Sequence, residues 1–355
     1  MARKRIVIIG SNFAGFTAAV ALKGLLRSAH DVTVISRFDQ FVFHPSLIRL
    51  PFGARTAQQA AFPVRPTFAE QGIAFRDEGA LKLDLAGHKV ITPTTEERYD
   101  FLVIATGAKP NYGAVPGLGP RGYTQSIMTL AEAEQARGAF ETFLKAPGPV
   151  VIGDVQDSSC RQPAYEFLLN MERVLDQRGL SSQVPLTHLT SGPKLAAEGL
   201  NVIANAAVAE ISPRQIRLAD GRTLPFAYSM LLPSFLGVDV VRACEKITDA
   251  AGFVRVNAFN QTDAHPEVFA AGAAVAAGPP EKSGWLAEKM GLRVAKNIAA
   301  CISGEALACA EPPETVNLPA SPIALDDGWI IPGAEAGWAQ GAFERYFPVG
   351  GTPLS

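Results

Sequence analysis

The feature that most constrains this chain is the stretch RIVIIGSNFAGFTAAVALKGLL, at residues 5–26. A run of apolar residues leads into a glycine turn, and a segment with apolar residues at helical spacing follows it. A strand that passes through a tight turn into a helix is the first unit of a dinucleotide-binding fold, in which the start of the helix faces a phosphate group. The sequence therefore predicts an α/β protein that binds a dinucleotide at this turn.

The turn departs from the usual glycine fingerprint at one position. Its glycines are Gly10 and Gly15, and Asn12 stands where a middle glycine is usual. Gly10 serves the tight turn, Gly15 lets the helix pack closely on the strand, and asparagine tolerates unusual backbone angles better than most residues. We expect these three residues, together with Phe13 and Ala14 between them, to bind the cofactor.

The next predicted strand, DVTVISRF at residues 31–38, ends in Ser36 and Arg37. An acidic residue normally binds the adenosine ribose at this place. Ser36 can still make one hydrogen bond to the ribose, so both residues are predicted to lie at the cofactor. Arg37 would also suit a 2′-phosphate, which leaves NADPH as a rival for this site.

Two further apolar strands end in small residues. The stretch RYDFLVIATG ends in Ala105, Thr106 and Gly107, and EVFAAG ends in Gly272. Together with the first motif, these segments resemble the flavin domain of the glutathione-reductase-like flavoproteins. The resemblance implies two Rossmann-like domains, a discontinuous FAD-binding domain, FAD as the cofactor, and cofactor contacts at these four residues.

The length of the chain agrees with two α/β domains, because 355 residues are too many for one small domain. We expect an FAD-binding domain at 1–112 and 250–310, and a second domain inserted at 113–249. The hairpin-like stretch around Asp220 and Gly221 belongs to the second domain. Residues 311–355 are predicted to form a C-terminal cap.

Composition excludes several classes of protein. The chain has 32 basic and 34 acidic residues with a formal charge of −2 and no long block of like charge, so we expect no nucleic-acid partner. Four cysteines in a chain of this length do not indicate a disulfide framework, and no metal site is predicted. No segment reaches the about 20 apolar residues of a membrane span. We expect a cytoplasmic protein; a peripheral position at the inner face of the membrane and a homo-oligomer stay open.

The second domain carries an altered nucleotide motif. In GPVVIGDVQDSS, at residues 148–159, the fingerprint positions hold Gly153, Val155 and Ser158. A valine side chain at the place where the backbone must approach a pyrophosphate argues against a standard nicotinamide site. We expect the domain fold to be kept without its cofactor.

Several segments resemble the sulfide:quinone oxidoreductases, and the likeness extends over nearly the whole chain. The most specific are the Ser-Cys-x-x-Pro-Ala-Tyr-Glu segment and the Lys-Ser-Gly before the last long helix. The others are FDQFVFHPSLIRLPFG, QSIMTLAEAE and AFERYF. The resemblance implies oxidation of sulfide or a related sulfur species, with electrons passing through FAD to a quinone.

The resemblance also implies that Cys160 is the redox thiol next to the flavin ring. Pro163 suits the first turn of a helix, so Cys160 is expected near the positive end of the helix dipole, where a thiolate is favoured over a thiol. Glu166, one helical turn further, could accept or donate a proton. The alternative is that Cys160 is only a small packed residue at a turn.

Lys282 precedes a second predicted helix, whose apolar stripe includes Leu286 and Val294. A lysine at a helix start that faces the pyrimidine edge of a flavin would stabilise the anion formed on reduction. We therefore predict Lys282 as a catalytic and cofactor-binding residue. The alternative is a solvated lysine at a helix start.

The cysteine pattern of the family is incomplete here. Met128 stands where the family often has a cysteine, Glu132 stands where a histidine often follows, and residues 273–280 contain no second redox cysteine. A single thiol can form a persulfide but cannot cycle through an intramolecular disulfide.

Two alternatives to the favoured hypothesis stay open. The first is an NAD(P)H-dependent flavin reductase that acts on a quinone or another acceptor, and the second is a non-catalytic flavin-binding or sulfur-sensing protein. Near the C-terminus, apolar residues could contact a membrane or cover the flavin domain; these are Trp329, Ile330, Ile331, Trp338, Phe343 and Phe347.

Overall fold

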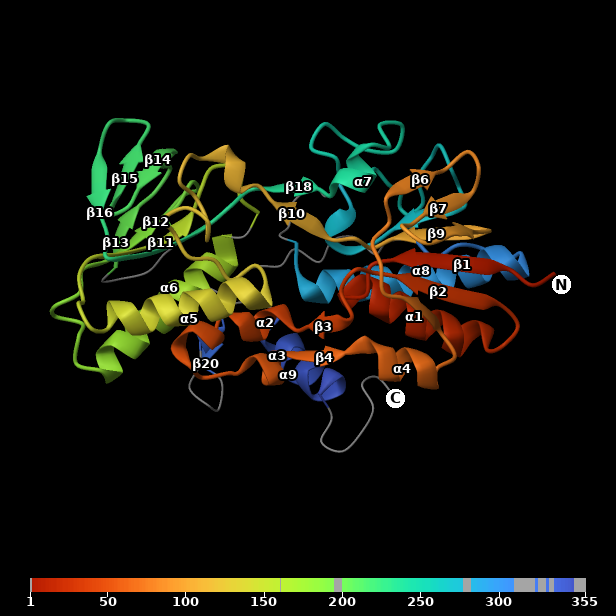
Figure 1. The fold of residues 1–355 in the computed structure, drawn as a ribbon, viewed down its shortest axis with the longest axis horizontal. Coiled ribbons are helices and arrows are strands. Elements are labelled where there is room, and N and C mark those ends of the chain that lie inside the picture. Colours follow the sequence, from red (N-terminus) through yellow and green to blue (C-terminus); the bar gives the residue numbers. More distant parts are fainter. Residues whose placement is uncertain are drawn as a thin grey trace.

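The computed structural model describes residues 2–159, 161–194, 200–276, 282–309, 323–324, 330–331 and 335–347. Two parallel sheets lie at opposite ends of the molecule, and each is covered by helices (Figure 1). This is the predicted α/β class with two Rossmann-like sheets.

The first sheet has five strands in the order β19-β9-β1-β2-β5, and every neighbouring pair is parallel. Its strands are β1 (Arg5–Ile9), β2 (Asp31–Ile35), β5 (Ala74–Arg76), β9 (Phe101–Ile104) and β19 (Val268–Ala270). The central strand β1 is apolar on both faces because both faces of this sheet are covered. All five strands run in one direction, so their carboxyl ends form a single edge.

Alternate residues of β1 enter different cores. Ile6 and Ile8 pack in one core with helix α1 (Phe13–Leu26) and helix α8 (Gly284–Ser303). Val7 and Ile9 pack on the opposite face in a core that includes residues of an antiparallel three-stranded sheet. That sheet consists of β6 (Lys82–Asp84), β7 (Lys89–Ile91) and β8 (Glu96–Arg98).

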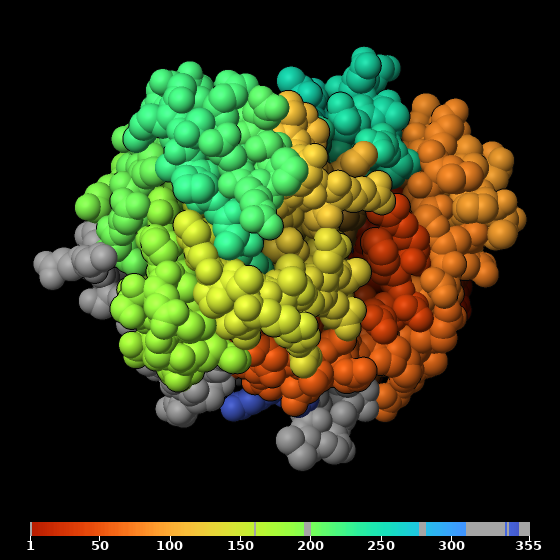
Figure 2. Space-filling model, turned by 60° about the vertical axis from the view of Figure 1, so that its left-hand side comes forward, coloured from red at the N-terminus to blue at the C-terminus, as the bar shows by residue number. Residues whose placement is uncertain are grey.

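A group of short elements follows β2 and leads toward the other end of the molecule (Figure 1). They are β3 (Gln40–Val42), α2 (His44–Leu47), η1 (Leu50–Phe52), α3 (Ala57–Ala60), β4 (Ala61–Pro63) and α4 (Val64–Glu70). The 3-10 helix η1 contacts α5 (Leu130–Phe143) of the second sheet. Figure 2 shows the yellow surface, which includes α5, directly against the orange-red surface of the N-terminal part of the chain.

The second sheet has four parallel strands in the order β13-β12-β11-β17. They are β11 (Val150–Asp154), β12 (Leu186–Leu189), β13 (Asn201–Ile203) and β17 (Tyr228–Leu232). Helices α5 and α6 (Arg161–Gln177) share one core with Val150 and Ile152 of β11. The opposite face packs on an antiparallel sheet of β14 (Val208–Ser212), β15 (Gln215–Leu218) and β16 (Thr223–Pro225).

The chain passes between the two sheets twice. β10 (Ala108–Pro110) follows β9 on the way out, and β18 (Phe235–Gly237) follows β17 on the way back. The two strands pair antiparallel between the halves of the molecule (Figure 1). Three short helical elements flank these crossings and the end of β19: η2 (Tyr112–Ala114), α7 (Asp239–Arg242) and η3 (Gly272–Ala274).

The described C-terminal elements are β20 (Ile323–Ala324), β21 (Ile330–Ile331) and α9 (Glu335–Tyr346). Trp338, Phe343 and Phe347 of this segment pack against the core of the first sheet. Trp329 lies outside the described residues, and the predicted domain limits stay predictions. Within the described ranges, no helix combines the length and the apolar character needed to cross a membrane.

Candidate active site

The carboxyl edge of the first sheet brings the predicted cofactor residues together. Gly10 has a φ of +107°, and a Cβ atom there would lie 2.2 Å from the carbonyl oxygen of Ala105. A Cβ atom on Gly15 would lie 2.0 Å from the carbonyl oxygen of Gly10. The turn between β1 and α1 can therefore be this tight only with glycine at both positions.

Asn12 caps helix α1. Its Oδ1 accepts a hydrogen bond of 3.0 Å from the backbone N–H of Phe13, the first residue of the helix. Its φ of −99° and ψ of −169° are ordinary extended angles, so capping, rather than tolerance of unusual backbone angles, is what asparagine does here. The first turn of α1 has no acidic residue. The start of a helix of this length attracts anions, so these residues fit the pyrophosphate of a dinucleotide.

Two other predicted segments lie against this turn. A Cβ atom on Gly272 would be 3.0 Å from Cβ of Ala14, and Gly272 begins η3 directly after β19. Ala105, Thr106 and Gly107 follow β9, which neighbours β1 in the sheet. The three strand ends thus form one site, although they are far apart in the sequence.

Ser36 and Arg37, the residues predicted to lie at the adenosine ribose, differ in their hydrogen bonding and in their exposure. The Ser36 hydroxyl is buried, donates to the carbonyl of Phe38 at 2.9 Å and accepts from the hydroxyl of Ser11 at 2.9 Å. A hydrogen bond from Ser36 to a ribose would have to replace one of these. Arg37 is exposed, and its guanidinium lies 4.8 Å from the centre of the Phe38 ring.

The ammonium group of Lys282 is bound by backbone. It donates to the carbonyl oxygens of Ala273 at 2.8 Å and of Val275 at 3.0 Å. It also lies 3.7 Å from the centre of the Phe253 ring. These contacts hold the turn after β19 to the start of α8, so Lys282 is partly buried at the edge where the cofactor residues meet.

The nucleotide turn of the second sheet is filled by its own side chains. Val155 is fully buried. The Gln156 side-chain amide pairs with the backbone of Val208: Nε2 donates to the carbonyl at 3.1 Å and Oε1 accepts from the N–H at 3.0 Å. Asp154 accepts a hydrogen bond of 2.6 Å from the hydroxyl of Ser191. Two hydrogen bonds of Gln156 therefore hold this loop to β14, and the buried carboxylate of Asp154 lies beside the loop.

Helix α6 begins at Arg161. Cys160, the predicted redox thiol, lies outside the described residues. Glu166 is 8% exposed on the first turns of α6, and its Oε1 accepts a hydrogen bond of 3.2 Å from the side chain of Gln162. Phe167, the next residue, packs on Phe52 of η1 with ring centres 4.9 Å apart. Glu166 thus lies near the contact between the two halves of the molecule.

A chain of hydrogen bonds was not foreseen from the sequence. Tyr112 donates to the hydroxyl of Ser126 at 2.8 Å, and Ser126 donates to Oε2 of Glu132 at 2.9 Å. Burial raises the pKa of Tyr112, so its phenol stays protonated and acts as a donor. Nothing in the local sequence joins Tyr112 to Glu132, because Ser126 links them only in the folded chain.

The remaining cysteines are free and distributed over the molecule. Cys244 and Cys301 are partly buried, and Cys309 is exposed. Cys244 packs on the core between the first sheet and the antiparallel sheet of β6, β7 and β8. Cys301 packs on the core that contains α1 and α8. Burial raises the pKa of both of these thiols, which opposes formation of a reactive thiolate.

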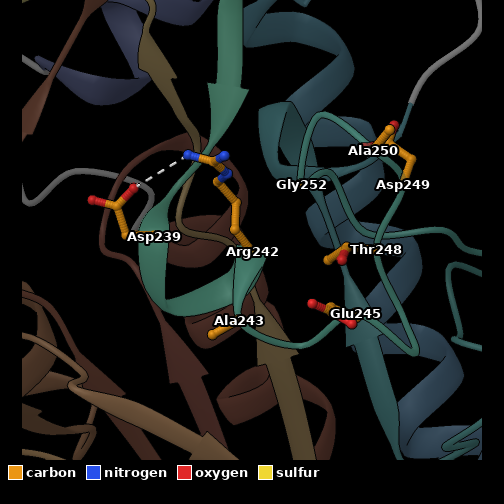
Figure 3. A pocket seen from close by; sticks show the side chains of 8 residues that line it. All are labelled: Asp239, Arg242, Ala243, Glu245, Thr248, Asp249, Ala250 and Gly252. Atoms are coloured by element: carbon orange, nitrogen blue, oxygen red, sulfur yellow. Dashed lines mark ion pairs between the residues drawn. The ribbon is translucent and has the colours of Figure 1, made fainter.

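A pocket of about 620 Å³ lies between α7 and the loop that follows it (Figure 3). Its lining includes the carboxylates of Asp239, Glu245 and Asp249, and Arg242 is the single basic residue among the residues that line it. The Arg242 guanidinium pairs with Asp239 at 3.6 Å. None of the predicted cofactor residues lines this pocket, and its acidic lining does not suit a pyrophosphate.

Comparisons with known proteins agree with this architecture. The family model described as pyridine nucleotide-disulphide oxidoreductase matches residues 4–153. The chain is 32% identical over 330 residues to the sulfide-quinone reductase of Aquifex aeolicus (strain VF5), an alignment that covers 83% of this chain and 76% of that protein. The chain belongs to the sulfide:quinone oxidoreductase family.

The crystal structure of a sulfide:quinone oxidoreductase from Aquifex aeolicus has a TM-score of 0.80 to this chain at 31% identity, and the match covers 85% of this chain and 77% of the other. The predicted family and fold class are thereby confirmed, and the protein is an FAD-dependent oxidoreductase of the sulfide:quinone oxidoreductase type. The residues at the start of α1 fit the cofactor that family members bind.

A partial match points to a neighbouring group of enzymes. An external alternative NAD(P)H-ubiquinone oxidoreductase, B4, of Arabidopsis thaliana is 30% identical over 145 residues, which cover 38% of this chain and 24% of that protein. The match with the sulfide:quinone oxidoreductase covers more than twice as much of the chain.

Proposed function

We propose that this protein oxidises sulfide or a related sulfur species at Cys160 and passes the electrons through FAD to a quinone. One observation of the structure supports this proposal in addition to the family membership. The nucleotide turn of the second sheet is filled by Val155 and fastened by Gln156 to β14, so a nicotinamide donor has no standard site. A small sulfur donor needs no such site.

The proposed chemistry at the thiol balances without a second cysteine. The Cys160 thiolate and HS⁻ together lose two electrons and one proton, and they become a Cys160 persulfide. FAD, when bound, supplies the acceptor for the two electrons. The proposed reactivity of the Cys160 thiol follows from its position in the sequence. Cys160 directly precedes the first residue of α6, and the dipole at the start of a helix favours a thiolate.

Other side chains of the chain have supporting roles in this proposal. Gly10, Asn12 and the start of α1 bind the pyrophosphate of FAD. Glu166, buried and one turn into α6, takes the proton that is released. Lys282, fixed by two carbonyl oxygens, places a positive charge at the start of α8.

The test is an anaerobic titration of the purified yellow protein with sulfide, with the visible flavin spectrum as the readout. We expect the flavin absorption to bleach in the wild type and in Cys309→Ser, whose thiol is exposed and remote from α6 in the sequence. We expect no bleaching in Cys160→Ser. An unchanged wild-type spectrum at high sulfide would refute sulfide oxidation and would favour the non-catalytic alternative.

A second candidate function has one observation in its favour, the partial likeness to NAD(P)H-ubiquinone oxidoreductases. In that case NADH or NADPH would reduce the flavin. The same spectrum recorded with NADH separates the two, because rapid bleaching by NADH and none by sulfide would favour a nicotinamide-dependent quinone reductase. Reoxidation of the reduced protein by a soluble short-chain quinone then tests the acceptor in either case.

A further inference from the structure

The C-terminal helix α9 is bound to α8 through one carboxylate. Oε2 of Glu288 accepts a hydrogen bond of 2.8 Å from Nε1 of Trp338, and Oε1 accepts one of 3.2 Å from Nη2 of Arg345. The Glu288 side chain is only 14% exposed. Trp338 and Arg345 are two helical turns apart on α9, so both can face α8. A single side chain of α8 therefore binds α9 at two places.

Trp338 lies between the starts of two helices. Its ring centre is 5.7 Å from that of Phe13, the first residue of α1. Its Cη2 would be 2.8 Å from a Cβ atom on Gly284, the first residue of α8. Phe43 stacks on the indole at 6.0 Å with an interplanar angle of 24°, and its ring centre is 5.7 Å from that of Phe13. The indole thus contacts the first residue of α1 and the first residue of α8, the helix ends next to the candidate cofactor site.

Further contacts along α9 keep it against the first sheet. The Tyr346 hydroxyl lies 3.3 Å from the hydroxyl of Thr17 in α1, and its ring stacks on Phe41 at 4.5 Å. The guanidinium of Arg55 lies 4.6 Å from the centre of the Phe343 ring. These contacts hold the far end of α9, so loss of the Glu288 contacts would release mainly the end that carries Trp338.

We propose that Glu288 is a positioning residue that keeps Trp338 across the starts of α1 and α8 and thereby slows the release of FAD. The inference rests on the proposed function in one respect, namely that FAD is bound at the start of α1. It does not depend on the sulfur donor or on the electron acceptor. Without Glu288, the Trp338 N–H and the Arg345 guanidinium lose a charged acceptor, and the indole is held by its ring contacts alone.

The experiment measures how fast the purified holoenzyme loses FAD after dilution, by the recovery of free-flavin fluorescence. We expect Glu288→Ala to release FAD about tenfold faster or more, because hydrogen bonds to a charged group are roughly twice as strong as neutral ones. Glu288→Gln keeps an acceptor for the Trp338 N–H and should be rescued to within about threefold of the wild type. Trp338→Phe keeps a ring but not the donor, so its release rate should be intermediate.

Two controls separate positioning from general loosening of the fold. Glu210→Ala removes an ion pair with Arg217 on β14 and β15 and should leave the release rate unchanged. In the double variant Glu288→Ala with Trp338→Phe, the two effects should not add, because both changes break the same contact. A purely structural role would instead give release rates that follow the loss of apo-protein stability from one variant to the next.

Release from Glu288→Ala at the wild-type rate would overturn the inference, and so would additive effects in the double variant. If Glu288→Ala fails to fold, the comparison of Trp338→Phe with the wild type decides, and equal rates overturn the inference. A wild-type protein that binds no FAD would refute the proposed function, and this inference with it. The two failures differ, because the first leaves a yellow protein and the second a colourless one.

Discussion

At the scale of single residues, the core of the second sheet contains polar groups that have no partner within the described part of the chain. The hydroxyl of Tyr228 and both ring nitrogens of His188 are examples. Both residues lie on strands of this sheet, with 3% and 1% of their surface exposed. A buried polar group without a hydrogen bond costs stability, so each side chain leads to a measurable expectation.

We predict that Tyr228→Phe stabilises the protein by about 1 kcal/mol, because the ring is kept and only an unpaired hydroxyl is removed. Its neighbours Phe140 and Phe143 are aromatic and offer no hydrogen bond in exchange. The free energy of unfolding in urea checks this. Tyr112→Phe is the matched control, because that hydroxyl donates to Ser126, and its loss should cost about 1 kcal/mol. A destabilised Tyr228→Phe would contradict the prediction.

The burial of the His188 ring leads us to predict that the stability of the protein depends on pH. Burial lowers the pKa of its ring in the folded protein below the ordinary value of about 6.5, while the unfolded chain keeps the ordinary value. Below about pH 6.5 the unfolded state therefore binds more protons, and the free energy of unfolding should fall by up to about 1.4 kcal/mol per pH unit. In His188→Leu this part of the slope should be absent, as urea unfolding between pH 5 and 8 would show. Equal slopes in both proteins would contradict it.

At the scale of elements, helices α1 and α8 approach each other at a glycine. A Cβ atom on Gly291 of α8 would lie 2.5 Å from the backbone oxygen of Ala14. Gly138 of α5 has no atom within 4 Å of its Cβ position. Both are helical glycines, yet only the structure separates a close contact from open space.

We predict that Gly291→Ala costs about 2 kcal/mol or more, because backbone atoms would have to move apart, and that it lowers the FAD content. Gly138→Ala should instead stabilise the protein by up to about 1 kcal/mol through helix propensity. Thermal unfolding and the ratio of flavin to protein absorbance measure both effects. A Gly291→Ala protein as stable and as yellow as the wild type would contradict the close packing of α1 on α8.

The helices themselves were largely predictable from local signals. The stretch after Gly10 indicated α1, and Pro163 indicated the start of α6, which the structure places two residues earlier, at Arg161. The turn at Asp220 and Gly221 lies between β15 and β16, as the sequence indicated. These features depend on neighbours in the chain, which is why the sequence is sufficient for them.

At the scale of the whole molecule, one core of the second sheet also takes in residues from the N-terminal part of the chain. Leu47, Ile48 and Leu50, from the short elements after β2, lie in the same core as α5, α6 and β11. The N-terminal part of the chain thus completes the interior of the second sheet. The domain limits stay predictions, and the packing of Leu47, Ile48 and Leu50 crosses them.

We therefore predict that unfolding of the holoenzyme in denaturant is a single transition. Flavin fluorescence, which reports on the first sheet, and far-UV circular dichroism, which reports on the whole chain, should give the same midpoint. Leu50→Ala should lower both midpoints together, at a cost of about 3 kcal/mol. Two separate midpoints would show that the halves unfold independently.

The sequence alone determined the family, the fold class and the turn at Gly10, because each depends on residue types at fixed spacing. The tertiary structure decided which groups meet. Gln156 binds Val208, 52 residues away, and Glu288 binds Trp338, 50 residues away. No periodicity links such pairs, since their approach depends on how sheets and helices pack rather than on local propensity. That packing fills the second nucleotide turn with Val155, and it brings Trp338 of α9 against Phe13, the first residue of α1.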